Sequence, residues 1–380
     1  MGRDIALYIH IPFCKAKCLY CDFPSFCGIE NYMVQYSEAL AKEILKYKDY
    51  NINSIFVGGG TPTYLSLQGW NLIKNSIDQL NKSEFCEFTI EGNPGTFEKE
   101  KLIFFKNMGV NRLSIGLQAW QDRLLIKVGR IHSTKDFVDS YNMARSIGFE
   151  NINVDLIFGL PTQNLGEWQE TLEQVVAMSP EHLSCYSLIL EEGTALMTQY
   201  EKGELELPSE EEERNMYDLA LKFLKESGYE QYEISNFSKK NRECKHNIVY
   251  WSLTDYAGCG LGSHSYLQGK RFSNTYNIEE YIENIILKGD AVAEVHINSV
   301  EDEMEEFVFM GLRKNSGISK KQFKIRFHRD IYDVYGDVIN KYIKMDLLKE
   351  YQDNISLTTE GIPISNSIMA EFILDKVENQ

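Results

Sequence analysis

The sequence has few residues of several kinds, and each shortage excludes a class of protein. Eight cysteines in 380 residues are too few for a disulfide scaffold. No apolar run approaches the ~18 residues that a transmembrane helix requires, and no secretory signal precedes the first strand-like run, which follows Met1-Gly2-Arg3-Asp4. We therefore expect a soluble cytoplasmic protein whose thiols stay reduced.

Basic residues are also in deficit. Lys and Arg number 39 against 56 Asp and Glu, which gives a formal charge of −17. This balance argues against a nucleic-acid partner, because Lys and Arg have to neutralise phosphates. Solenoid repeats and low-complexity tracts are absent from the sequence as well. What remains is an ordinary globular composition, with 43% hydrophobic and 25% charged residues.

Three cysteines near the start are the most informative residues present. Cys14, Cys18 and Cys21 are separated by three and then two residues, and a loop with this spacing can present three thiolates to one compact cluster. A [4Fe–4S] cube has four iron corners held by cysteine thiolates, so three protein ligands leave one corner open to a small molecule. The alternative is structural zinc, which needs four ligands; Cys27 or His10 would supply the fourth.

Short β-rich runs alternate with amphipathic stretches along residues 1–235. This alternation predicts a parallel sheet with helices outside it. Six such units are too few to close an eight-fold barrel, so we predict an α/β fold with a partial, open (βα)6 barrel. The expected strands are Ile5–His10, Ser54–Val57, Cys86–Glu91, Arg112–Ile115, Asn151–Ile157 and His182–Leu188. Apolar residues at helical spacing predict intervening helices, for example from Met33 to Ile44.

Two further regions follow the predicted barrel domain. Residues 236–300 show little periodicity, and we interpret them as a connecting region. Residues 301–380 combine apolar helices near Met304–Leu312 and Ile331–Met345 with a strand and turn, which is typical of a small winged-helix-like α+β domain. That shape often binds DNA, but the acidic balance favours a lid or a partner surface.

Polar residues and glycines gather at the carboxyl ends of the expected strands. In (β/α) barrels the site assembles at this edge from the loops of several strands, so residues distant in sequence converge. Glycines allow close approach of backbone to a ligand, a buried carboxylate needs a partner, and arginine offers fixed donors to a carboxylate. The candidate residues are Gly59, Gly60, Thr61, Glu91, Gln118, Arg130 and Asp155.

The cysteine spacing resembles that of the radical S-adenosylmethionine (SAM) superfamily. The sequence before the first cysteine is similar to the N-terminal part of the oxygen-independent coproporphyrinogen oxidase group, and most similar to its haem-chaperone (HemW) branch. This motif is Tyr8-Ile9-His10-Ile11-Pro12-Phe13-Cys14. The resemblance implies that Cys14, Cys18 and Cys21 hold a [4Fe–4S] cluster whose free iron binds SAM. It implies SAM contacts for the seven candidates above, and contacts of Tyr8 and Tyr20 with SAM or substrate.

A second sequence motif extends the resemblance to haem binding. Lys245-His246-Asn247-Ile248-Val249-Tyr250-Trp251 resembles the HNxxYW element of the HemW branch. This resemblance implies that His246 is a haem ligand and that residues 236–300 are a connecting and haem-binding region. Histidine is a common ligand of haem iron, and Tyr and Trp can stack on a porphyrin. From chemistry alone, a loop histidine beside aromatics is also consistent with a core or surface residue. The glycine-rich stretch Gly258–His264 is interpreted as a tight backbone path beside the porphyrin or SAM pocket.

The sequence departs from the oxidase branch at one informative place. That branch has a further cysteine two residues after the third, whereas here Cys21 is followed by Asp22-Phe23. The resemblance therefore implies a haem chaperone that binds the cluster, SAM and haem and passes haem to an acceptor, such as a respiratory protein. A flavodoxin or a ferredoxin is a candidate electron donor. The alternative is an oxygen-independent coproporphyrinogen III oxidase, a radical SAM enzyme that decarboxylates its substrate.

Overall fold

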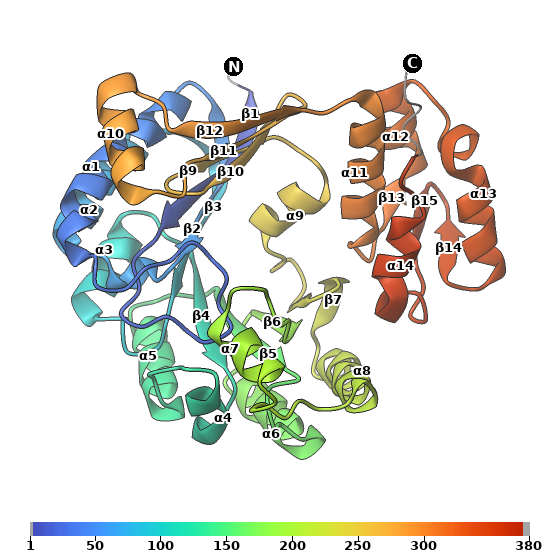
Figure 1. Ribbon diagram of the computed structural model, residues 1–380, viewed down its shortest axis with the longest axis horizontal. Helices are drawn as coiled ribbons and strands as arrows, with labels where there is room; N and C mark the ends of the chain where they lie inside the picture. The colour runs from blue at the N-terminus through green and yellow to red at the C-terminus, as the bar shows by residue number, and fades with distance from the viewer. Residues whose placement is uncertain (1–2, 375–380) are drawn as a thin grey trace.

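The computed structural model describes residues 3–374. A 12-stranded sheet forms the larger part of the molecule, in the order β12-β11-β10-β9-β1-β2-β3-β4-β5-β6-β8-β7 (Figure 1). The six strands β1 to β6 are parallel to one another and lie side by side in chain order. They overlap the six predicted ranges. They are β1 (Asp4–Ile11), β2 (Asn51–Gly59), β3 (Asn81–Gly92), β4 (Arg112–Gln118), β5 (Ile152–Phe158) and β6 (His182–Ser187).

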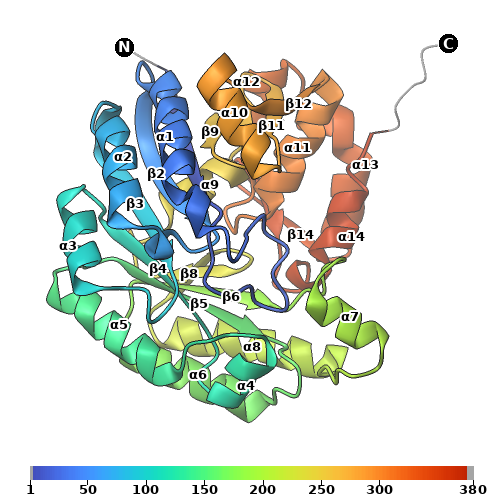
Figure 2. The ribbon, with the colours of Figure 1, turned by 60° about the vertical axis from the view of Figure 1, so that its left-hand side comes forward.

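Helices cover the outer face of these strands (Figure 2). The connections are α1 (Met33–Ile44), α2 (Leu67–Ile77), α3 (Lys99–Asn107), α4 (Asp122–Lys127), α5 (Thr134–Ser146), α6 (Leu165–Ala177), α7 (Ala195–Glu201) and α8 (Glu210–Glu226). Short 3-10 turns occupy Glu30–Tyr32, Leu45–Tyr47, Pro62–Tyr64 and Ile362–Ile364. Capping boxes at Ser133, Asn164 and Ser209 begin α5, α6 and α8, because each side chain accepts from an otherwise unpaired amide of the first turn.

The sheet ends at β12 on one side and at β7 on the other, so the barrel is open, as predicted. Apolar side chains between sheet and helices form the main core, and they include the fully buried Trp70 and Trp168. Burial of such large side chains contributes most to the stability of the layered arrangement. No helix within residues 3–374 combines the length and the apolar content that crossing a bilayer requires.

Residues 236–300 extend the sheet instead of merely connecting two domains. β9 (Tyr256–Cys259) pairs with β1 in parallel, and β10 (His264–Leu267), β11 (Lys270–Asn274) and β12 (Val292–Ile297) continue the sheet antiparallel. These strands contain residues that are depleted in β-strands, such as Gly258 in β9, Lys270 and Asn274 in β11, and Glu294 in β12. At the other end lie β7 (Glu230–Glu233) and β8 (Asn236–Ser238); α9 (Lys245–Trp251) and α10 (Ile278–Lys288) complete the region.

The C-terminal part has its own core and the predicted winged-helix-like order. Its elements are α11 (Val300–Leu312), β13 (Ile318–Ser319), α12 (Lys320–Phe327), α13 (Ile331–Lys344), β14 (Leu348–Tyr351), β15 (Asn354–Leu357) and α14 (Ser365–Ala370). Phe307, Phe323 and Tyr335 pack at its centre, and Leu253, between α9 and β9, and Tyr266 of β10 join this core. The C-terminal part is therefore packed on the barrel side that carries β9 and β10. Residues 375–380 of the predicted domain lie outside the described residues.

Candidate functional site

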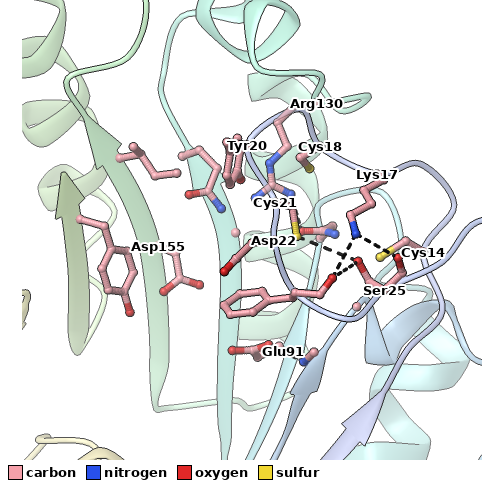
Figure 3. A pocket seen from close by; sticks show the side chains of 18 of the residues that line it. Cys14, Lys17, Cys18, Tyr20, Cys21, Asp22, Ser25, Glu91, Arg130 and Asp155 are labelled. Carbon is pink, nitrogen blue, oxygen red and sulfur yellow. Dashed lines mark hydrogen bonds between the residues drawn. The ribbon is translucent and has the colours of Figure 1, made fainter. Parts of the chain in front are cut away.

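A cavity of about 370 Å³, the first cavity, opens at the carboxyl ends of the parallel strands (Figure 3). Parallel strands end at one edge of the sheet, so this edge gathers side chains from four strands and the loop after β1. Ten residues singled out from the sequence line the first cavity: Cys14, Cys18, Tyr20, Cys21, Gly59, Gly60, Glu91, Gln118, Arg130 and Asp155.

The three cysteines reach the first cavity from the single loop that follows β1. Cys14 is buried, with its Sγ 3.5 Å from Thr61 Oγ1, and the half-buried Cys21 has its Sγ 4.0 Å from Ser25 Oγ. Burial raises the pKa of both thiols above the ordinary cysteine value. A bound cationic metal would supply the charge that stabilises their thiolates.

The geometry argues against the zinc alternative. Cys27 is exposed and does not line the first cavity. His10 is buried, with Nδ1 3.0 Å from the Tyr8 hydroxyl and Nε2 2.9 Å from the Pro24 carbonyl oxygen. Within residues 3–374, no three His, Cys, Asp or Glu side chains converge on one ion position. Three thiols that face one cavity without closing on one ion fit the separate corners of a polynuclear cluster.

Two glycines shape the wall between the cysteine loop and β2. A Cβ atom at Gly60 would lie 2.9 Å from the carbonyl oxygens of Ile11 and Phe13. Gly59 has φ of +107°, and its Cβ would lie 2.3 Å from the His10 ring. A side chain fits at neither position, because the backbone packs closely against the strand β1 and the cysteine loop. Both glycines line the first cavity.

Two carboxylates face the first cavity from β3 and β5. Glu91 Oε2 accepts a hydrogen bond from the Gly59 amide at 3.3 Å. Asp155 accepts from Ser114 Oγ at 3.0 Å and from Asn153 Nδ2 at 2.8 Å. Desolvation, reinforced by the charge of Asp155, raises the pKa of Glu91 to about 8. A ligand that brings a cation or hydrogen-bond donors would offset this unfavourable burial.

Arg130 brings a positive charge to the same cavity. Its Nη1 donates to Asn93 Oδ1 at 2.7 Å, and its guanidinium carbon lies 5.9 Å from the centre of the Tyr20 ring. Its Nε is buried without a hydrogen-bond partner among the described residues. Such an unpaired donor is costly and is suited to a ligand carboxylate. Thr61 stands behind the cavity wall, where its Oγ1 accepts from Asn93 Nδ2 at 2.9 Å.

Sequence reasoning missed several residues of the first cavity. Asn93 and Ser114 line it beside the predicted Glu91 and Asp155, and Ile189 lines it from the loop after β6. The signal for Asn93 was its place two residues beyond Glu91, at the same strand end. Ser114 and Ile189 have no chemical signature, since serine and isoleucine are common in strands and loops that bind nothing.

A second cavity, of about 460 Å³, lies where β1, α9, β10 and α11 meet. Tyr8 lines this second cavity and not the first. Tyr250 and Trp251, the two aromatic residues that end the His246–Trp251 motif, also line it. Phe23 lines both cavities, so the two adjoin at this side chain.

His246 lies in the interior and lines neither cavity. It belongs to the helix α9 and not to a loop, and only 1% of its surface is exposed. Nδ1 lies 2.9 Å from Ser54 Oγ, and Nε2 lies 2.8 Å from the Tyr250 hydroxyl. Burial lowers the pKa of His246 to about 3. The structure thus does not bring His246 to an open position for haem, because both ring nitrogens are engaged.

Known proteins are similar in sequence to this chain over nearly its whole length. The radical SAM superfamily matches residues 8–175, and the HemN C-terminal domain matches residues 298–364. The heme chaperone HemW of Bacillus subtilis is 38% identical, over 96% of this chain and 98% of its own. HemW of Lactococcus lactis is 35% identical over 99% of both chains. The mitochondrial radical S-adenosyl methionine domain-containing protein 1 of Danio rerio is 30% identical, over 98% of this chain and 87% of its own.

Among solved structures, the coproporphyrinogen III oxidase HemN of Escherichia coli matches with a TM-score of 0.86. The two chains are 23% identical, and the match covers 98% of this chain and 90% of that one. At this identity the likeness shows a common fold. The full-length similarity to HemW proteins is closer in sequence and includes both matched regions. The chain belongs to the HemW family within the radical SAM superfamily.

Proposed function

We propose that the protein is a cytoplasmic haem chaperone, which holds a [4Fe–4S] cluster and SAM, binds haem and transfers it to an acceptor protein. A respiratory haem protein is the acceptor class that we favour. The observation that carries the proposal is the similarity, over 96% of this chain, to a relative described as a heme chaperone. The acidic charge of −17 supports a role without nucleic acid.

The residues of the first cavity fit the two cofactors. Cys14, Cys18 and Cys21 would each bind an iron, which leaves one iron for SAM. Arg130, with its unpaired Nε, would bind the carboxylate of SAM. Glu91 and Asp155 would accept hydrogen bonds from its amino and ribose hydroxyl groups. A cluster held by these cysteines would supply an electron to SAM, and a flavodoxin or a ferredoxin would be its electron donor.

The chain's own residues would prepare this cavity in two ways. Gly59 and Gly60 have no side chain, and their backbone forms the part of the cavity wall beside the cysteine loop. Asn93 holds Arg130 through the 2.7 Å contact and is itself held to Thr61, so the guanidinium is oriented before the ligand arrives. Such preorganisation lowers the entropic cost of binding.

Oxidation of coproporphyrinogen III is the competing function, and the shared fold with HemN is its support. Phe23 occupies the position at which the oxidase branch has its further cysteine. Phe23 lines both cavities. This departure favours the chaperone over the enzyme.

One set of anaerobic measurements tests the proposal. The reconstituted protein is assayed for iron and sulfide, titrated with haem, mixed with an apo-acceptor, and separately incubated with coproporphyrinogen III, SAM and reductant. We expect about four irons per chain, stable haem binding, transfer to the acceptor and no protoporphyrinogen. Turnover of coproporphyrinogen III without stable haem binding would contradict the chaperone function and support the oxidase function.

A further inference from the structure

The second cavity has the size and the walls of a site for a flat apolar ligand. Its volume of about 460 Å³ falls within the roughly 300–1,000 Å³ typical of small-molecule sites. Tyr8, Tyr250, Trp251 and Tyr256 line it from β1, α9 and β9. Aromatic side chains of this kind stack on planar ring systems. A porphyrin is such a ring system, and its iron would need a donor from the same cavity.

His264 is placed to be that donor. It is the first residue of β10, its side chain is exposed, and it lines the second cavity. Nε2 lies 2.9 Å from the Tyr276 hydroxyl, whereas Nδ1 has no hydrogen-bond partner within residues 3–374. Histidines that bind metals generally use the second ring nitrogen in a hydrogen bond that fixes the orientation of the ring. Tyr276, which also lines the cavity, provides this contact.

The glycine-rich stretch before His264 makes room for this pair. Gly262 has φ of +60°, and a Cβ atom there would lie 2.8 Å from the ring of Tyr276. Any side chain at this position would push the tyrosine away from His264. The stretch therefore has a local reason to contain glycine, and that reason is the placement of the His264–Tyr276 pair.

A second donor approaches from the C-terminal part. Met310 of α11 lines the same cavity, and a methionine thioether can bind haem iron opposite a histidine. His246 offers no comparable position, because Ser54 and Tyr250 engage its two nitrogens and almost none of its surface is exposed. Its neighbours Tyr250 and Trp251, in contrast, face the cavity.

We propose that the second cavity is the haem site and that His264, oriented by Tyr276, is a ligand of the haem iron. The inference rests on the proposed function, since it assumes that the chain binds haem. The ligand of the haem iron is then a residue outside the His246–Trp251 motif. Within that motif, Tyr250 and Trp251 form an aromatic wall of the haem site. The haem would lie beside the first cavity, with Phe23 between them.

The test compares three variants of the full-length protein: His264→Ala, Tyr276→Phe and His246→Ala. Each is reconstituted anaerobically with its cluster and titrated with ferric haem. Electron paramagnetic resonance at low temperature then reports the ligands of the ferric iron, because the oxidised [4Fe–4S] cluster gives no signal. Thermal unfolding verifies that each variant is folded, and added imidazole tests for rescue.

We expect His264→Ala to lose the histidine-type haem signal and at least tenfold in haem affinity, and imidazole to restore the signal. Tyr276→Phe should retain haem with altered ligand-field values, and His246→Ala should retain the wild-type signal even where affinity falls. A wild-type signal in His264→Ala, or loss of the signal in His246→Ala, would overturn the assignment. Failure of the wild type to bind haem would instead contradict the proposed function itself.

Discussion

The Nδ1 atom of His246 lies 2.9 Å from the Oγ atom of Ser54, so a strand of the barrel holds the imidazole of α9 in the interior. The Tyr250 hydroxyl binds the other ring nitrogen, and the ring centre lies 5.2 Å from that of Phe56. Ser54 is itself buried. This network makes His246 a residue that positions α9, and thereby Tyr250 and Trp251, against the second cavity.

Replacement of His246 should therefore destabilise the fold. His246→Ala leaves the Ser54 and Tyr250 hydroxyls without partners and opens a void, which together should lower the free energy of unfolding by about 2–4 kcal/mol. His264→Ala is the matched control: its side chain is exposed, and its replacement should change stability by less than ~0.5 kcal/mol. Anaerobic urea unfolding measures both values. Equal stability of the two variants would show that the interior network contributes little.

The cysteines provide a prediction with a control in the same loop. Replacing Cys14, Cys18 or Cys21 by serine should each abolish a stable cluster, since each removes one of three protein ligands. Cys27→Ser should retain iron and sulfide at the wild-type level, because Cys27 is exposed and lies outside the first cavity. Iron and sulfide assays with anaerobic visible spectra give the result. Loss of iron in Cys27→Ser would identify Cys27 as a fourth ligand.

The sequence allowed the barrel and the first cavity to be predicted for a common physical reason. Residues such as Glu91 and Gln118 lie at the carboxyl ends of parallel strands, and these ends meet at one edge of the sheet. Asp155 lies in the middle of β5 and also lines the first cavity. The orientation of His246 could not be predicted, because a seven-residue helix packed on several sides has no single apolar stripe. The strands β9 to β12 were missed because they contain glycine, lysine, asparagine and glutamate, which are depleted in strands.

Arg130 should contribute strongly to SAM affinity. A charge-assisted hydrogen bond contributes about 1.5–3 kcal/mol, so Arg130→Ala should weaken SAM binding roughly 10- to 100-fold. The SAM affinity of Arg130→Lys should lie between those of the wild type and Arg130→Ala, because lysine keeps the charge but lacks the planar guanidinium. Arg123→Ala is the control, since Arg123 pairs with Glu167 and does not line the first cavity. Calorimetric titration of the cluster-loaded protein with SAM would contradict the assignment if both alanine variants bound alike.

Glu91 makes the stability of the SAM-free protein depend on pH. Its pKa is raised from 4.5 to about 8 by desolvation and by the charge of Asp155, so between these values the folded state holds a proton that the unfolded chain releases. Stability falls with rising pH wherever the folded state binds more protons. Glu91 therefore does not reduce the stability of the folded protein below pH 4.5. The reduction grows between pH 4.5 and about pH 8 and is complete above that.

Glu91→Gln removes this penalty, because the amide has the same shape and carries no charge. The variant should unfold at a higher temperature than wild type at pH 9, by a few degrees, and the difference should shrink toward zero near pH 5. Glu38→Gln, at an exposed position of α1, controls for the change in net charge. Thermal unfolding without SAM across this range gives the result. A difference that does not change with pH would mean that Glu91 is ionised in the folded protein throughout, with its charge compensated inside the first cavity.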